Sequence, residues 1–234
     1  MVSRRLLALP ALIALLVLGA CAAGGDTQAD EPAPALRPAT DPGTLLEPVL
    51  APVDESAVDP AVASMEYQVG DTGPAGGVVF YVSAEGFACG PDLASRCNYL
   101  EAAPGSSEVR RGWADTPRLE LAVDGADDSA IGAGWANTLD IVALGNTDPM
   151  TSAAAYADAY EFGGFDDWYL PAKDEFNELY EQRDMVGGFS GADYWSSSEV
   201  SSDMAWSHYF HQGHPMLPHP KNHYTHLIRP VRAF

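Results

Sequence analysis

Basic residues are scarce in this sequence. Only 12 lysines and arginines stand against 33 aspartates and glutamates, which gives a net charge of −21 over 234 residues. Nucleic acids and sulfated polysaccharides are bound through cationic groups that displace their counterions, so neither is an expected partner. We interpret the acidity chiefly as a source of solubility.

Long apolar runs are missing after the first twenty residues. Residues 1–20 combine Arg4 and Arg5 with an apolar run and a small-residue cleavage site, the pattern of a secretory signal peptide. Residues 18–21 (LGAC) resemble a bacterial lipobox, which implies cleavage before Cys21 and a lipid on its sulfur. Both the general and the twin-arginine export routes stay open. We therefore expect an exported protein held by this lipid to the bacterial envelope, at the outer membrane or the cell surface.

Cysteine is also rare, with three in the chain. Once Cys21 is assigned to lipid, Cys89 and Cys97 remain, close together in a turn-rich segment. A zinc site would need further ligands nearby, and the neighbouring residues supply none. In an exported chain the pair predicts a disulfide.

Composition divides the chain into three parts. After the signal peptide, residues 21–64 are rich in alanine, proline and acids and poor in aromatic residues, which predicts a disordered linker. Residues 65–234 are long enough for one domain with its own core. The expected helices are 133–144, 151–162 and 172–183. The expected strands are 78–82, 98–103, 167–171, 193–199, 204–211 and 225–234, with one long loop before the last. This order predicts an α+β fold.

Three segments of this domain resemble the Lcl C-terminal domain family. They are 69–82 (VGDTGPAGGVVFYV), 163–180 (GGFDDWYLPAKDEFNELY) and the C-terminal stretch with YWSSSE, AW and IRPVRAF. The family comprises bacterial surface domains of C-type-lectin-like fold, some of them in adhesins. The resemblance implies mixed or antiparallel sheets flanked by two or three helices. The EPN, QPD and WND tripeptides of sugar-binding C-type lectins are absent, which argues against calcium-dependent sugar binding.

Patterns for catalysis are absent as well. The sequence has no G-x-S-x-G, and its glycine-rich turn at 70–77 leads into a strand without the lysine of a phosphate-binding loop. We expect no enzymatic activity. Arg229 and Arg232 are expected to pair with acids inside the domain, and Trp113, Trp168, Trp195 and Trp206 to fill its core.

All six histidines lie in the last 27 residues. Tyrosine, histidine, asparagine and serine together suit a contact surface, so residues 201–226 are expected to bind a glycan or protein at the cell surface. The candidate ligand-binding residues are His208, Tyr209, His211, His214, His219, Asn222, His223 and Tyr224.

Two metals and two further functions stay open. His214, His219, His223 and His226 could gather around Zn²⁺, whereas Asp124, Asp127 and Asp128, with Asp166 and Asp167 nearby, could hold Ca²⁺. The sequence requires neither ion. The alternative to ligand binding is a metal-binding or pH-responsive envelope protein, because six ordinary imidazoles would charge below about pH 6. A purely structural envelope protein is the third interpretation.

Overall fold

The computed structural model describes residues 66–210, 215–222 and 225–234. Each of them belongs to the contact unit Val53–Phe234, and the other unit, Met1–Pro52, lies wholly outside the described residues. The expected signal peptide, the lipidation site at Cys21 and the linker therefore lie outside them too. So do four of the candidate binding residues, namely His211, His214, His223 and Tyr224. In the described part of the chain, no helix combines the length and the apolar character needed to cross a membrane.

The smaller of two sheets joins the start of the domain to its end. It contains β1 (Val78–Cys89), β2 (Ser95–Ala102) and β8 (Val231–Ala233), in the order β1-β2-β8, with antiparallel pairs. The predicted disulfide is confirmed: Cys89 at the end of β1 is bonded to Cys97 on β2, with an S–S distance of 2.02 Å.

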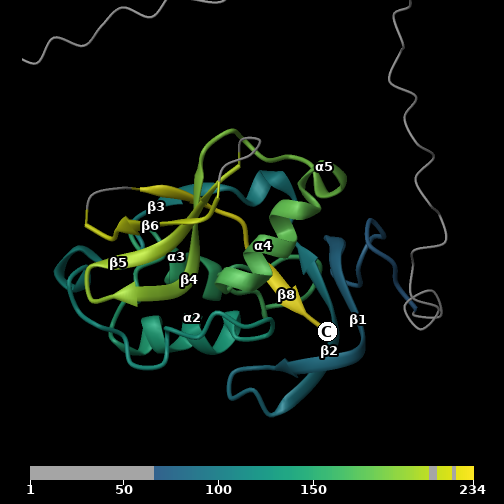
Figure 1. Cartoon of the computed structure of the whole chain (residues 1–234), viewed down its shortest axis with the longest axis horizontal. Coiled ribbons are helices and arrows are strands. Elements are labelled where there is room, and N and C mark those ends of the chain that lie inside the picture. The colour runs from purple at the N-terminus through teal and green to yellow at the C-terminus, as the bar shows by residue number, and fades with distance from the viewer. Residues whose placement is uncertain (1–65, 211–214, 223–224) are drawn as a thin grey trace, which may run out of the picture. The chain divides into compact units, whose positions relative to one another are not determined.

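The larger sheet has five strands in the order β3-β7-β4-β5-β6. Its members are β3 (Val109–Arg111), β4 (Asp193–Ser201), β5 (Met204–Tyr209), β6 (Leu217–Pro220) and β7 (His226–Ile228). The β4–β7 pair is parallel and the other pairs are antiparallel, so the sheet is mixed. Figure 1 shows β4, β5 and β6 on one side of the domain, β1, β2 and β8 on the other, and α4 between them.

Four helices complete the α+β fold that the sequence predicts. They are α2 (Gly134–Ala143), α3 (Ala153–Asp158), α4 (Lys173–Glu181) and α5 (Arg183–Val186), with short 3₁₀ turns at Gly105–Ser107 and Thr116–Arg118. At the start of α3, the Ser152 hydroxyl accepts a hydrogen bond from the Ala155 N–H. At the start of α4, the Glu175 carboxylate accepts one from the Ala172 N–H at 2.7 Å. Each contact satisfies a backbone donor that a helix start leaves unpaired.

Two buried clusters cover the two faces of the larger sheet. On one face, Trp195 and Ile228 pack with Ile141 of α2 and with Trp113. Tyr194 and Leu227 alternate onto the other face and join Phe176 of α4. These two clusters fix the sheet between α2 and α4, and the side chains at its strand ends are fixed with it.

The expected internal pairing of the C-terminal arginines is confirmed. Arg229 Nη2 lies 2.5 Å from Glu108, and Arg232 lies 2.8 Å from Glu101 and 2.7 Å from Asp167. Trp113, Trp168 and Trp195 are fully buried as expected. Trp206, the last of the four tryptophans expected in the core, is only half-buried and lies against the Lys173 ammonium.

The structure corrects several predicted elements. Residues 167–171 form no strand and contribute one bridge, Tyr169 to Val231. The predicted strand 225–234 is two strands, β7 and β8, because Pro230 has no N–H to continue a ladder and the chain changes sheets there. The predicted loop before it holds β6, which pairs with β5. Helix α3 is shorter than predicted because Tyr160 and Phe162 instead pack on Trp168.

Candidate functional site

Three strands bring titratable side chains to one face of the larger sheet. Asp193 and Trp195 alternate onto this face of β4, and Ser207 of β5 is paired with Trp195. His219 of β6 reaches the same face, since its Nδ1 lies 2.9 Å from the Ser207 hydroxyl. His226 of β7 does so too, with its ring centre 4.0 Å from that of Trp195.

These side chains form a compact cluster. His219 Nδ1 lies 3.0 Å from His226 Nε2. One ring nitrogen of each histidine and one carboxylate oxygen of Asp193 all lie within 4.8 Å of one another. Across the described ranges 66–210, 215–222 and 225–234, it is the only group of three or more His, Cys, Asp or Glu close enough to share a metal ion.

The cluster lies at the boundary between core and solvent. His226 is buried, whereas His219 and Asp193 are half-buried. Burial, together with the nearby His219 and Arg110, lowers the pKa of His226 to about 3, so this imidazole is neutral near pH 7. Burial also lowers the pKa of His208. The expectation that all six histidines have ordinary pKa values is therefore wrong for these two.

A pocket of about 450 Å³ opens next to the cluster, between β3 and the residues Lys221, Asn222 and Thr225. Its polar lining comes from Arg110, Arg111, Thr116, Thr151, Lys221, Asn222 and Thr225. Arg110 donates to the Thr225 carbonyl at 3.3 Å, and Arg111 donates to the Pro149 carbonyl at 2.7 Å. Neither guanidinium forms an ion pair with a carboxylate of the described residues.

The third cation of the pocket is neutralised. Lys221 is buried, forms an ion pair with Glu199 and donates to the Ser202 carbonyl at 3.1 Å. Asn222 donates to the Glu120 carboxylate at 2.9 Å. These contacts fix one wall of the pocket and leave Arg110 and Arg111 as its positive groups.

The structure separates the predicted ligand-binding residues. His208 points to the opposite face of the sheet from the cluster and is 3% exposed, stacked on Tyr180 at 4.0 Å and close to Phe210. Its burial removes this imidazole from any surface that a ligand could reach. His219 lies in the cluster, Asn222 lines the pocket, and Tyr209 is half-buried at the end of β5.

The predicted histidine metal site is partly assembled. His219 and His226 come together, but on strands rather than in a loop, and their third partner is Asp193. His214 and His223 lie outside the described residues.

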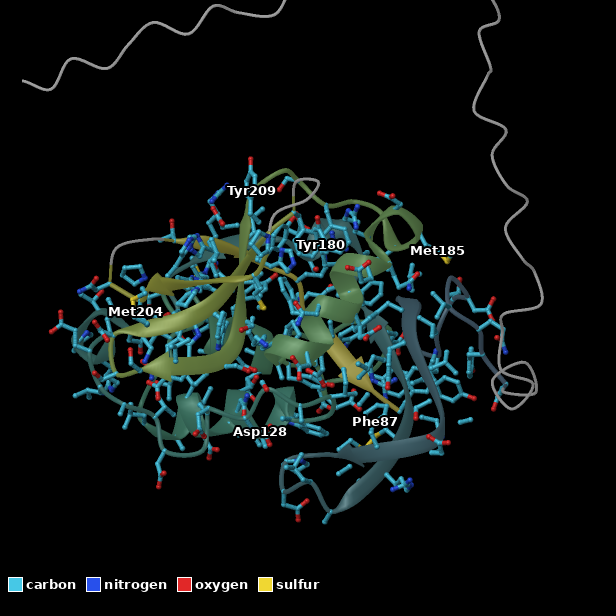
Figure 2. The ribbon with its side chains drawn as sticks, in the orientation of Figure 1. Phe87, Asp128, Tyr180, Met185, Met204 and Tyr209 are labelled. Carbon is cyan, nitrogen blue, oxygen red and sulfur yellow. A yellow bond between two sulfur atoms is a disulfide. The ribbon has the colours of Figure 1, made fainter. Side chains whose placement is uncertain are left out.

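The predicted calcium ligands do not form a shared site among the described residues. Asp124, Asp127 and Asp128 are exposed, and the Asp128 carboxylate instead accepts from the Ala130 N–H at 2.9 Å. The Asp167 carboxylate instead accepts hydrogen bonds from Arg232. Figure 2 shows Asp128 and Tyr209 at opposite sides of the domain.

Sequence reasoning missed Asp193, Arg110 and Arg111. A signal for Asp193 was present: it alternates with Trp195 on a predicted strand, which places both on one face. The two arginines had no such signal, because the strand that carries them is three residues long and its partner, β7, begins 115 residues after it ends.

Comparison with known families gives one match. Residues 122–232 match the family described as Lcl C-terminal domain. The match includes α2 to α5, β4 to β7, the three cluster residues and the Lys221–Asn222 wall of the pocket. It leaves out β1, β2 and β3, and with β3 the two pocket arginines. No curated protein matches the chain.

Proposed function

Residues 122–232 form a domain of the Lcl C-terminal domain family, and on this basis we propose that the chain is a non-catalytic binding protein of the bacterial envelope. Its ligand is a glycan or a protein at the cell surface. The binding site is the pocket that β3 forms with Lys221, Asn222 and Thr225. Lipid on Cys21 holds the protein to the membrane, and residues 21–64 carry the domain away from it.

The observation that carries this proposal is the pair of arginines in the pocket. Most cations of this acidic domain are near carboxylates, but Arg110 and Arg111 donate to backbone carbonyls instead. A guanidinium binds carboxylates well because its N–H groups match the two carboxylate oxygens. The ligand therefore carries an acidic group, such as the carboxylate of an acidic sugar or of a protein side chain.

The neighbouring residues suit recognition more than chemistry. Thr151, Asn222 and Thr225 offer hydrogen-bonding groups beside the two guanidiniums. None of the residues that line the pocket is a histidine, cysteine, aspartate or glutamate, the usual general bases and strong nucleophiles. This composition supports binding without turnover.

The proposal is tested with the purified full-length chain on an array of acidic and neutral glycans and a panel of envelope proteins. The double variant Arg110→Gln/Arg111→Gln is compared with wild type. Arg96→Gln is the matched control, because Arg96 is an exposed arginine that also donates to a backbone carbonyl, that of Gly86 at 3.3 Å.

We expect wild type and the control to bind an acidic ligand, and the double variant to bind it at least about tenfold more weakly. Equal binding by all three proteins would exclude the pocket as the ligand site.

A further inference from the structure

We propose that Asp193, His219 and His226 form a binding site for one divalent transition-metal ion, with Zn²⁺ the best fit. The site is separate from the arginine pocket, so either proposal can fail without the other.

The first argument is the geometry of the donor atoms. A zinc ion bound by nitrogen and oxygen at about 2.0–2.2 Å holds its ligands roughly 3.3 Å apart in a tetrahedron. His219 Nδ1 and His226 Nε2 are 3.0 Å apart, and one oxygen of Asp193 lies within 4.8 Å of a ring nitrogen of each histidine. These separations are close to those that the ion requires.

The second argument is the rigidity of the supports. Each ligand lies on a strand of the same sheet, β4, β6 or β7, and the face they share is closed by Trp195. Lys221 and its ion pair with Glu199 anchor the chain directly after β6. A site on fixed strands loses little conformational entropy when an ion binds, unlike a site on loops.

The third argument is the set of outer contacts. The Ser207 hydroxyl lies 2.9 Å from His219 Nδ1, and the His226 ring is hydrogen-bonded to the backbone of Thr225. The backbone partner orients the His226 imidazole, whereas the Ser207 hydroxyl gives up its contact when His219 Nδ1 binds the ion. His219 Nδ1 and His226 Nε2 face each other at 3.0 Å, so both nitrogens can turn toward one ion.

The chemistry of the three donor atoms determines which class of ion the site binds. Two imidazole nitrogens and one carboxylate oxygen suit zinc and its neighbours, whereas Ca²⁺ and Mg²⁺ require oxygen ligands. The Asp193 carboxylate supplies a negative charge, and Arg110 is a nearby positive charge that opposes the ion. Three protein ligands leave a fourth position for water or for a donor of a partner.

The experiment titrates the full-length chain with Zn²⁺ by calorimetry, and with Co²⁺ to read the visible absorption of a tetrahedral site. Asp193→Asn and His219→Gln each remove one ligand from a half-buried position, so the fold is expected to survive; circular dichroism without metal checks this. The matched comparison is the triple variant His211→Gln/His214→Gln/His223→Gln, which removes three histidines that are not among the proposed ligands.

We expect one Zn²⁺ per chain for wild type and for the triple variant, with a higher melting temperature when the ion is bound. Affinity falls at least about tenfold in Asp193→Asn and in His219→Gln, since even outer-shell changes cost that much. Three results would overturn the proposal: no binding by wild type, unchanged affinity in both single variants, or loss of binding in the triple variant alone.

Discussion

The Lys221 ammonium lies 4.2 Å from the centre of the Trp113 ring, and Glu199 balances its charge. Its side chain is 0% exposed and that of Glu199 is 7% exposed, so both charges have left water. Burial lowers the pKa of Lys221, and the contact with Glu199 opposes that shift. A buried charge is tolerated only while its partner is present.

Replacement of Lys221 by methionine is expected to lower the free energy of unfolding by about 3–5 kcal/mol, because Glu199 is left buried and unpaired. Chemical denaturation followed by tryptophan fluorescence measures the change. The double variant Lys221→Met/Glu199→Gln should regain part of the loss. Lys173→Met is the control, since Lys173 pairs with Asp174 at the surface and should cost less than about 1 kcal/mol. Equal losses for Lys221→Met and Lys173→Met would refute this account of Lys221.

The burial of His208 determines how this residue makes the free energy of unfolding depend on pH. Its pKa is lowered by burial between Tyr180, Phe176 and Phe210, although Glu181 and Asp193 favour its charged form. In the unfolded chain its pKa is near 6.5. Below that pH the unfolded chain takes up a proton that the native state resists, so this contribution to stability is lost as the pH falls.

His208→Phe keeps an aromatic ring in the slot and removes the titration. We expect the variant to gain stability relative to wild type as the pH is lowered from 7 to 5, in urea melts at several pH values. The comparison cancels other groups, among them Glu175, whose pKa burial raises to about 7 and whose contribution has the opposite sign. Tyr209→Phe is the control and should follow wild type. Parallel curves for wild type and His208→Phe would contradict the prediction.

Among the elements, the β1–β2 hairpin depends most on a covalent bond. Cys89 and Cys97 close a loop with a sequence separation of 8 at the end of the hairpin. The double replacement Cys89→Ser/Cys97→Ser is expected to lower the free energy of unfolding by about 2–3 kcal/mol, mainly by freeing the unfolded chain. Thermal melts with and without reductant measure it: reductant should destabilise wild type and leave the variant unchanged. An equal response of both proteins to reductant would count against it.

Local patterns predicted most elements of the fold. Runs rich in aromatic residues and serine at 193–199 and 204–211 predicted β4 and β5, and the helical spacing of Phe176, Leu179 and Tyr180 predicted α4. The failures are β6, the break between β7 and β8, and the strand expected at 167–171. These depend on which strands pair in the folded domain, and local sequence patterns do not show that.

The candidate site was predicted only in part for the same reason. His219 and His226 were expected to share a site, but Asp193, their third partner, is 26 residues before His219 and meets it only through the sheet. Arg110 and Arg111 meet Lys221, Asn222 and Thr225 through the β3–β7 pair. The order of strands in the sheet determines which residues meet in the cluster and in the pocket, and the sequence does not reveal that order.

At the scale of the whole molecule, the proposal places a folded domain at the end of an acidic linker on a lipid anchor. Cys21→Ser removes the acceptor of the lipid, so the protein should move from the membrane fraction to the soluble fraction after cell lysis. Labelling with a fatty-acid analogue should mark wild type and spare the variant. The matched control is Cys89→Ser/Cys97→Ser, which removes thiols and should retain the lipid. A Cys21→Ser protein that remains labelled and in the membrane fraction would contradict the anchor.

The central claim is that the pocket beside the C-terminal strands binds an acidic ligand and does not transform it. Calorimetric titration of the full-length chain with the acidic ligand found on the array, followed by mass spectrometry of the recovered ligand, tests it most directly. The account predicts saturable binding that weakens at least about tenfold in Arg110→Gln/Arg111→Gln, with the ligand recovered unchanged. The same affinity in both proteins, or a chemically altered ligand, would contradict it.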